Sequence, residues 1–276
     1  MVRKAVIVAA GYGTRFLPVS RVVPKELLPL GGRPTLDWVV EELANAGIDD
    51  ILVITSRRKR AIDDWFDRDV ELETALPNRL ADLRPRAVRT TLIRQPSMAG
   101  TGHALLLARG FAGSDPVVVV YPDDLFEGTN PTAELVAAHA ATGRSALLAL
   151  DMPHEDVSRY GVIDVAPGSG SLRAVRRLVE KPPRGEEPSH LVSLGRYLLL
   201  PAFFDALTDG LTGHTSGEYH HVPALNVLAA RGDVVSVATQ ATYLDTGTPS
   251  GWLRAAVRHE SRRDPAFAAW LREGAP

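Results

Sequence analysis

The chain has 276 residues, of which 45% are hydrophobic and 23% are charged, and its formal net charge is −2. These values are those of an ordinary globular protein, and the near-neutral charge gives no support for nucleic acid or an anionic membrane surface as a partner. The absence of cysteine excludes disulfides, thiolate metal sites and a cysteine nucleophile.

Neither a targeting segment nor a membrane span is expected. Residues 1–4 lead directly into a strand-like run, which does not fit a signal peptide. No apolar stretch approaches the ~20 residues that a membrane span needs. We therefore expect a cytoplasmic protein.

The first half of the chain alternates strands and helices. Apolar runs predict strands at 4–10, 50–55, 88–95, 116–124 and 145–150, and helical periodicity predicts helices at 36–47, 58–66, 102–110 and 132–141. Residues 11–34 are rich in glycine and proline and form a loop of a length that is usually functional or disordered. The alternation predicts an α/β fold with a Rossmann-like mixed, mostly parallel sheet flanked by helices.

The second half contains fewer helices. Its strand-like segments are YGVIDV, LRAVRRLVEKP, LVSLGRYLLL, DVVSVAT and ATYLDTG. Helices are expected at 218–232, at 250–262 and in the C-terminal DPAFAAWLRE. Because no internal repeat or linker is present, we interpret residues 1–276 as one continuous domain that ends in the helices of 251–276.

The first strand is followed by a glycine loop, AAGYGTRFLP. The dinucleotide-binding fingerprint requires a glycine at position 16 and an acidic residue at position 55, but this chain has Phe16 and Thr55 there. The P-loop of nucleoside triphosphatases requires a Lys-Ser/Thr pair after its glycines, and no such pair follows here. Gly11 and Gly13 still allow backbone N–H groups to approach a ligand, and Arg15 adds a planar donor fork that suits phosphate oxygens. The loop alone is compatible with a phosphate site or with a plain turn.

The longer pattern GYGTRFLPVSRVVPKELLPLGGRP closely resembles the signature of sugar-1-phosphate nucleotidylyltransferases, and within them the bacterial UTP–glucose-1-phosphate uridylyltransferase family. The resemblance extends from Lys4 to about Leu271. It implies transfer of a uridylyl group from UTP to a hexose-1-phosphate, with glucose-1-phosphate as the expected acceptor and pyrophosphate as the second product. It also implies that 1–150 mainly bind the nucleotide, that 151–250 mainly bind the sugar, and that the enzyme is a homo-oligomer (dimer or tetramer).

The resemblance also assigns the phosphate-binding residues. Arg15 would hold the triphosphate, and Lys25 and Lys181 would neutralise phosphate charge, so these three are the expected catalytic residues. Lysine occurs at only four positions among 31 basic residues, which argues against Lys25 as a generic surface charge. The remaining residues expected on the nucleotide in this loop are Ala10, Gly11, Gly13 and Thr14.

Two aspartates are expected to hold Mg²⁺. Asp123 and Asp124 follow the most hydrophobic strand, and ligands of open α/β sheets bind at the carboxyl ends of strands. Mg²⁺ is usually held by one or two carboxylates together with phosphates. The resemblance implies Asp123 and the distant Asp245 as the metal ligands and leaves the role of Asp124 open.

The sugar and the base are assigned by the same resemblance. Glu180 would accept hydrogen bonds from sugar hydroxyls, and Lys181 would contact the sugar phosphate; Pro182 marks the strand end at which two adjacent side chains can share one site. The other expected sugar-binding residues are Gly161, Gly195, Arg196 and Glu218. The residues expected to read uracil are Gln95, Gly100 and Gly102.

Several alternatives remain open. A thymidylyltransferase or a relative of relaxed specificity is the second interpretation, and a non-catalytic sugar-nucleotide sensor is the third.

The segment SGEYHHVPALN departs from the family pattern on the sugar side, although Glu218 is retained. A metal role for the adjacent His220 and His221 is disfavoured, because adjacent residues on a helix do not face one ligand. The basic run RRKR at 57–60 is expected to be a solvated helix start.

Overall fold

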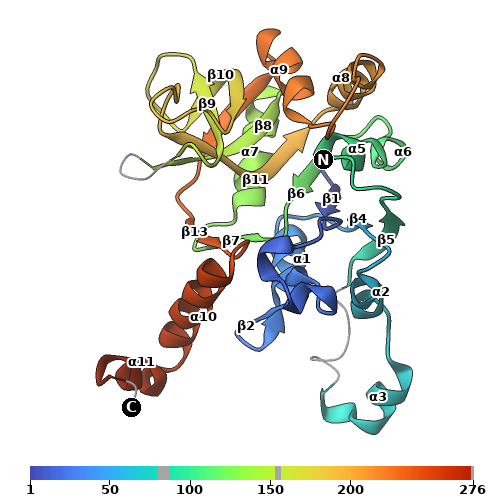
Figure 1. The fold of residues 1–276 in the computed structure, drawn as a ribbon, viewed down its shortest axis with the longest axis vertical. Coiled ribbons are helices and arrows are strands. Elements are labelled where there is room, and N and C mark those ends of the chain that lie inside the picture. The colour runs from blue at the N-terminus through green and yellow to red at the C-terminus, as the bar shows by residue number, and fades with distance from the viewer. Residues whose placement is uncertain (80–86, 153–156, 275–276) are drawn as a thin grey trace.

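The computed structural model describes residues 1–79, 87–152 and 157–274, which contain one nine-stranded sheet and two small two-stranded sheets. The strands of the large sheet lie in the order β5–β4–β1–β6–β11–β8–β12–β10–β9 (Figure 1). Their bounds are β1 (Lys4–Val8), β4 (Asp50–Thr55), β5 (Arg89–Arg94), β6 (Val117–Val120), β8 (Ser145–Asp151), β9 (Gly161–Val165), β10 (Leu172–Glu180), β11 (Leu191–Leu199) and β12 (Val234–Ala238).

The α/β class is confirmed, but the prediction of a mostly parallel sheet is right only for the first half of the chain. There, β5, β4, β1 and β6 are parallel to one another. In the second half β11 pairs antiparallel with β6, β8 and β9, and β10 pairs antiparallel with β9 and β12. The reason is that β9, β10 and β11 follow one another without a helix between them, and a parallel pair needs a crossover connection.

The two small sheets shape the loops at one end of the large sheet. The strand expected over 116–124 ends at Val120, and the chain enters a new strand at Asp124. In the first small sheet β7 (Asp124–Glu127) pairs antiparallel with β13 (Thr242–Asp245), so Asp245 lies opposite Asp124. In the second, β2 (Pro29–Leu30) pairs with β3 (Arg33–Pro34) within the long loop.

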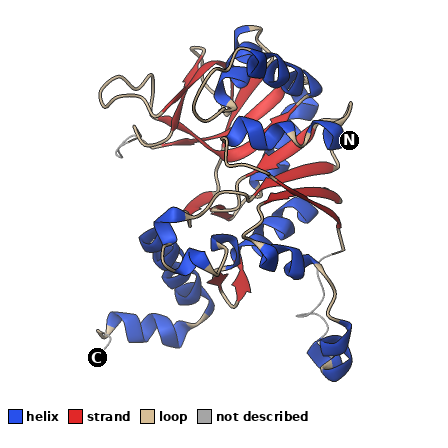
Figure 2. Cartoon of the chain, turned by 45° about the vertical axis from the view of Figure 1, so that its right-hand side comes forward, coloured by secondary structure: helices blue, strands red, loops and turns tan. Residues whose placement is uncertain are grey.

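Helices cover both faces of the large sheet (Figure 2). On β1, Ala5 and Ile7 belong to a cluster with α1 and α7, whereas Val6 belongs to a second cluster with α5, α8 and α9, as the alternation of side chains along a strand requires. The helix bounds are α1 (Thr35–Asn45), α2 (Arg60–Phe66), α3 (Val70–Ala75), α5 (Thr101–Leu106), α6 (Arg109–Ala112), α7 (Pro131–Thr142), α8 (Pro201–Thr212), α9 (Val222–Ala230), α10 (Pro249–Arg263) and α11 (Pro265–Arg272).

Two of the helices were not predicted from the sequence. The missed helices are α3 and α8, and α8 buries Phe203, Phe204 and Leu207 against the sheet. The C-terminal helices α10 and α11 were predicted and extend away from the large sheet (Figure 1). Within the described ranges, none of the helices has the length and apolar composition needed to cross a membrane.

Candidate active site

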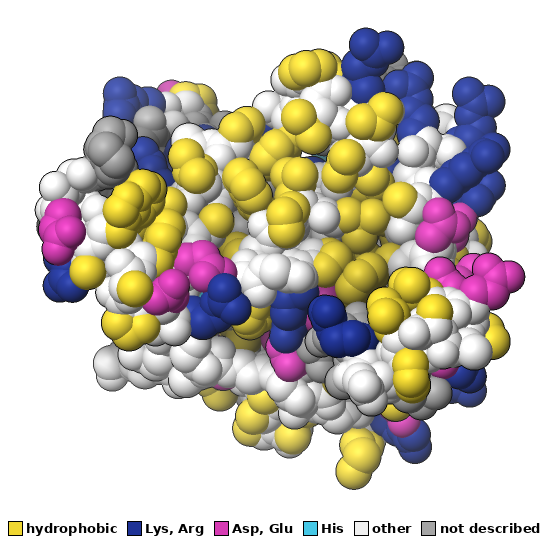
Figure 3. All heavy atoms as spheres, turned by 90° about the horizontal axis from the view of Figure 1, so that it is seen from below, with side chains coloured by type: hydrophobic (Ala, Val, Ile, Leu, Met, Phe, Trp, Pro, Cys, Tyr) yellow, Lys and Arg dark blue, Asp and Glu magenta, His cyan; other side chains and the backbone are white. Residues whose placement is uncertain are grey.

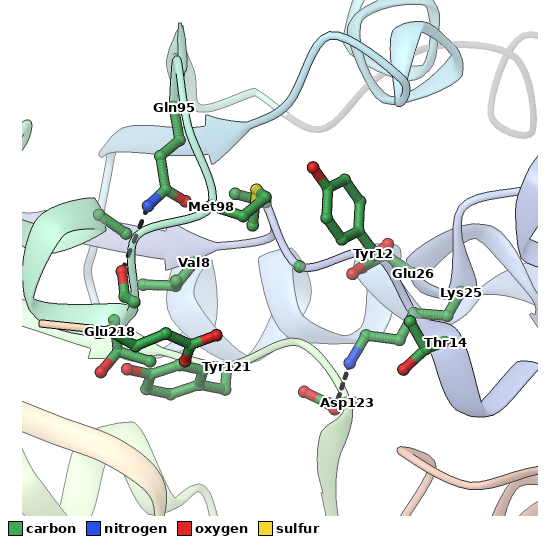
Figure 4. Close-up of a pocket in the computed structure, with 15 residues that line it drawn as sticks. Val8, Tyr12, Thr14, Lys25, Glu26, Gln95, Met98, Tyr121, Asp123 and Glu218 are labelled. Carbon is green, nitrogen blue, oxygen red and sulfur yellow. Dashed lines mark hydrogen bonds and ion pairs between the residues drawn. The ribbon is translucent and has the colours of Figure 1, made fainter. Parts of the chain in front are cut away.

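A pocket of about 450 Å³ opens beside the carboxyl ends of β1 and β6 (Figure 4). A volume of this size is typical of a pocket for a small-molecule ligand. Four separate segments of the chain contribute to it, namely the glycine loop, the loop before α5, the segment after β6 and the loop before α9. The lining residues are Val8, Ala10, Gly11, Tyr12, Thr14, Lys25, Glu26, Gln95, Met98, Gly100, Thr101, Ala104, Tyr121, Asp123 and Glu218.

The glycine loop folds into three short 3₁₀ helices, Thr14–Phe16, Val19–Arg21 and Lys25–Leu27. Gly13 has a φ of 65°, a left-handed conformation that favours glycine, and no protein atom lies within 4 Å of the position that a Cβ of Gly11 would occupy. Phe16 is buried and anchors the loop, which explains why glycine is absent there. Arg15 is exposed and does not line the pocket, so the structure leaves it apart from Lys25.

Lys25 donates to Asp123 across the floor of the pocket (Figure 4). Burial acts to lower the pKa of Lys25, but the carboxylates of Asp123 and Glu26 outweigh it and raise that pKa above its usual value. Burial conversely acts to raise the pKa of Asp123, and Lys25 outweighs it and lowers that pKa. The two groups therefore face each other as a charged pair.

The RRKR segment at 57–60 is not fully solvated as expected, because Lys59 is buried. Arg57, Arg58 and Arg60 are exposed, but Lys59 is only 5% exposed. Its Nζ donates to the backbone oxygen of Ala9 at 2.7 Å and to both carboxylate oxygens of Glu26 at 2.7 and 2.8 Å. Because Ala9 directly follows β1 and Glu26 directly follows Lys25, this pair fixes the glycine loop to the sheet.

Asp123 and Asp245 converge on one glycine. A Cβ on Gly247 would lie 2.9 Å from Oδ2 of Asp123 and 3.2 Å from Oδ1 of Asp245, so both carboxylates need the space that glycine leaves. The pairing of β13 with β7 brings the two together, and the N–H and Oγ1 of Thr246 donate to the backbone oxygen of Asp123. Two convergent carboxylates fit Mg²⁺, whose remaining ligands are usually phosphate oxygens and water. Within the described residues, no group of three or more His, Cys, Asp or Glu side chains is placed so that it could hold a metal ion.

Arg196 and Gly195 lie behind the site, not on its surface. Arg196 was expected to contact the sugar, but its side chain is 0% exposed. Its five donors are all used, on both carboxylate oxygens of Glu42 at 2.9 Å and on the backbone oxygens of Tyr121, Asp124 and Gly195. Arg196 therefore holds the segment that carries Asp123 from behind.

Asp124 has a structural role in this network. It accepts from the hydroxyl of Tyr243 at 2.6 Å and from the backbone N–H of Gly195 at 3.0 Å. A Cβ on Gly195 would lie 2.3 Å from Asp124 Oδ2, so glycine is required there for packing. Burial, together with the neighbouring charge of Asp123, raises the pKa of Asp124 to about 6.

Gln95 lies at the opposite end of the pocket from Lys25 (Figure 4). Its Nε2 donates to the backbone oxygen of Gly100 at 3.2 Å and lies 3.1 Å from Nδ1 of His103. Because a carbonyl oxygen only accepts, the amide orientation is fixed and Oε1 is directed toward the pocket. This end of the pocket therefore presents a hydrogen-bond acceptor.

Gly100 and Gly102 serve a contact that the sequence analysis did not foresee. They were expected to admit a base, but the backbone that approaches them most closely is that of 219–220. Gly102 N–H donates to the oxygen of Tyr219 at 2.8 Å, and Tyr219 N–H donates to the oxygen of Ala99 at 2.7 Å. This pairing carries the preceding Glu218 into the same pocket as Gln95.

Three of the expected sugar-binding residues, Gly161, Glu180 and Lys181, form a second group that does not line this pocket, whereas Glu218 does line it. Gly161 is paired with Glu180 between β9 and β10, and a Cβ on Gly161 would lie 3.1 Å from Oε2 of Glu180. Lys181 directly follows β10 and has a φ of 46°, an uncommon conformation for a residue other than glycine. Its Nζ lies 3.8 Å from Oε1 of Glu180, and both side chains are exposed. Glu180 and Lys181 thus share one surface, as the strand end predicted.

The two adjacent histidines point to different partners. His221 is buried and its Nδ1 lies 2.8 Å from Oγ1 of Thr101, whereas His220 is exposed and its Nε2 lies 3.9 Å from Oε2 of Glu218. Burial, with a smaller effect from His220, lowers the pKa of His221 to about 4. His221 is therefore a neutral structural residue between α9 and α5.

Sequence and structure comparisons agree on one family. The family described as nucleotidyl transferase matches residues 4–262. A UTP–glucose-1-phosphate uridylyltransferase of Staphylococcus epidermidis is 36% identical over 279 residues, which cover 98% of this chain and 96% of the relative. A putative enzyme of the same name from Methanocaldococcus jannaschii is 35% identical over 99% of this chain and 98% of the relative.

Solved structures of similar proteins superpose closely. A crystal structure of apo UDP-glucose pyrophosphorylase has a TM-score of 0.88 and 30% identity and covers 96% of this chain and 100% of that chain. A UTP-bound UGPase from Acinetobacter baumannii has a TM-score of 0.87 and 30% identity over 99% of this chain and 98% of that chain.

We predict that Arg196→Lys destabilises the protein. Lysine keeps the charge but cannot reproduce five donors in a fixed fork, and a broken buried pair typically costs about 3 kcal/mol. Urea denaturation should therefore show a lower free energy of unfolding than for the wild type. The matched control is Arg57→Lys at an exposed position, and equal stability of the two variants would contradict the assignment.

We also predict that His221 makes the protein acid-sensitive. Its folded pKa of about 4 lies below the unfolded value of ~6.5, so its stabilisation is complete above pH ~6.5 and is lost as the pH falls toward 4. The wild type should lose on the order of 3 kcal/mol more than His221→Leu between those pH values. Parallel loss of stability in both proteins, followed by chemical denaturation at each pH, would refute this role.

Proposed function

The chain belongs to the nucleotidyl transferase family, and we propose that it transfers the uridylyl group of UTP to glucose-1-phosphate, giving UDP-glucose and pyrophosphate. The observation that carries the proposal is the arrangement of one pocket, with an amide acceptor at one end and a lysine beside convergent carboxylates at the other. Near full-length identity to named uridylyltransferases supports the same reaction.

Gln95 supports a pyrimidine with a protonated N3. Its Oε1 faces the pocket because Nε2 is held by Gly100, so it accepts from the N3–H of uracil. Cytosine has an acceptor at N3, which would face the acceptor Oε1 of Gln95 without a hydrogen between them, and this lowers the affinity. Thymine shares the N3–H, so this contact alone does not separate UTP from dTTP.

The phosphate end supports nucleotidyl transfer without a protein nucleophile. Gly11 and Thr14 line the pocket beside Lys25, where backbone and ammonium donors can stabilise charge on the α-phosphate and on the leaving pyrophosphate. Glu180 and Lys181 would orient the attacking sugar phosphate, and Arg15 would reach the triphosphate from the exposed side of the loop. Mg²⁺, held by Asp123 and Asp245, would neutralise phosphate charge when bound.

The assembly we propose is a homo-oligomer. Hydrophobic side chains gather across one face of the molecule (Figure 3). Large hydrophobic side chains that remain exposed include Val22 on the glycine loop, Val70 and Leu72 on α3, and Trp270 on α11. We infer that part of this exposed apolar surface is covered in the oligomer, because large contiguous apolar patches mark contacts between protein chains.

Pyrophosphate release across a panel of nucleotides tests the reaction. With glucose-1-phosphate and Mg²⁺, we expect turnover with UTP and none with CTP, because uracil offers N3–H to Gln95 and cytosine does not. ATP, GTP and dTTP complete the panel. Binding of UDP-glucose without turnover for any nucleotide would contradict the enzymatic function and favour a sensor.

The carboxylate of Asp123 should be required for turnover. Asp123→Asn removes the charge that faces Lys25 and a hard oxygen ligand, so we expect kcat to fall by about 100-fold or more at saturating Mg²⁺. The exposed carboxylate of Asp205 provides the control variant Asp205→Asn. Wild-type activity of Asp123→Asn, with an intact fold by circular dichroism, would refute the assignment.

A further inference from the structure

We propose that Glu218 binds the ribose hydroxyls of the nucleotide and so makes the site selective for ribonucleotides. This inference rests on the proposed function, because it assumes that a uridine nucleotide occupies the pocket. It differs from the role expected from the sequence, in which Glu218 belonged with the hexose. The grounds are the position of the carboxylate, the way its loop is held and its lack of a close partner.

The position of Glu218 follows the order of groups in a nucleotide. The Glu218 carboxylate is directed into the pocket between Gln95 and the Lys25–Asp123 pair (Figure 4). A nucleotide that places its base at Gln95 and its α-phosphate at Lys25 must place its ribose between them, since the ribose is the covalent link. The hexose attaches beyond the phosphates, toward Glu180, which does not line this pocket.

The loop of Glu218 is fixed to the loop that holds Gln95. Tyr219 N–H donates to Ala99 oxygen at 2.7 Å and Tyr219 oxygen accepts from Gly102 N–H at 2.8 Å. The Tyr219 side chain is 6% exposed, and its hydroxyl donates to the backbone oxygen of Leu207. Glu218 and the loop of Gln95 are therefore held together as one unit by these backbone contacts.

The carboxylate of Glu218 is available to a ligand. Its side chain is 65% exposed, and among residues 1–79, 87–152 and 157–274 its ion-pair contact is His220 Nε2 at the long distance of 3.9 Å. A carboxylate has two oxygens and accepts from two hydroxyls at once, which matches the neighbouring 2′- and 3′-hydroxyls of a ribose. Deoxyribose lacks one of these donors and would leave a carboxylate oxygen unpaired.

The test compares UTP with 2′-deoxy-UTP and 3′-deoxy-UTP in the wild type, Glu218→Gln and Glu218→Ala. A hydrogen bond to a charged group corresponds to about 10- to 100-fold in kcat/KM, so the wild type should prefer UTP over each deoxynucleotide by that factor. In Glu218→Ala the activity with UTP should fall by the same factor, the activity with the deoxynucleotides should barely change, and the preference should approach 1. Glu218→Gln, which keeps one acceptor oxygen, should be intermediate.

Two control variants make the outcome specific. Gln95→Ala should lower the activity with UTP and with both deoxynucleotides by the same factor. Glu71→Ala, an exposed position on α3, should change neither these activities nor the preference for UTP. Unchanged preferences in Glu218→Ala, or a rise only in the KM for glucose-1-phosphate, would overturn the ribose assignment. A wild type that turns over no nucleotide would contradict the proposed function instead, so the two failures are distinguishable.

Discussion

The ion pair between Lys25 and Asp123 joins the two halves of the pocket, and most other features of the site support it. It links the glycine loop to the segment after β6 across 98 residues of sequence. Directly beside it, Lys59 and Glu26 hold the loop against Ala9, and on the far side Arg196 holds the backbone around Asp123. Removal of one partner from such buried pairs leaves an uncompensated charge, so the network constrains the site to one geometry.

Local sequence features predicted the strands of the large sheet and most helices. Apolar runs followed by glycine or carboxylates pointed to the segments that follow β1 and β6 and to the end of β13, because ligands of α/β sheets collect at the carboxyl ends of strands. The rarity of lysine was also informative. The four lysines pair with Asp115, Asp123, Glu26 and Glu180, respectively, in chain order.

The rest depends on contacts that no local pattern shows. Arg196 was misplaced because its partner Glu42 is 154 residues away and lies on another element. Gly100 and Gly102 were expected to leave space for a ligand, and they also admit the backbone of residues 219–220, although Gly100 lines the pocket as well. Lys59 was hidden within a basic run whose other members are exposed. In each case a segment that is distant in the sequence determines whether a charged or small residue lines the pocket or instead holds the backbone around the pocket.

The central claim is that the nucleotide lies along one pocket with its base at Gln95 and its α-phosphate at Lys25. A crystal structure of this protein with UTP and Mg²⁺ tests it most directly. We expect uracil N3 within hydrogen-bond distance of Gln95 Oε1, the ribose hydroxyls on Glu218, and the α-phosphate beside Lys25 with the metal between Asp123 and Asp245. A uracil ring bound elsewhere, or a triphosphate outside the glycine loop, would contradict it.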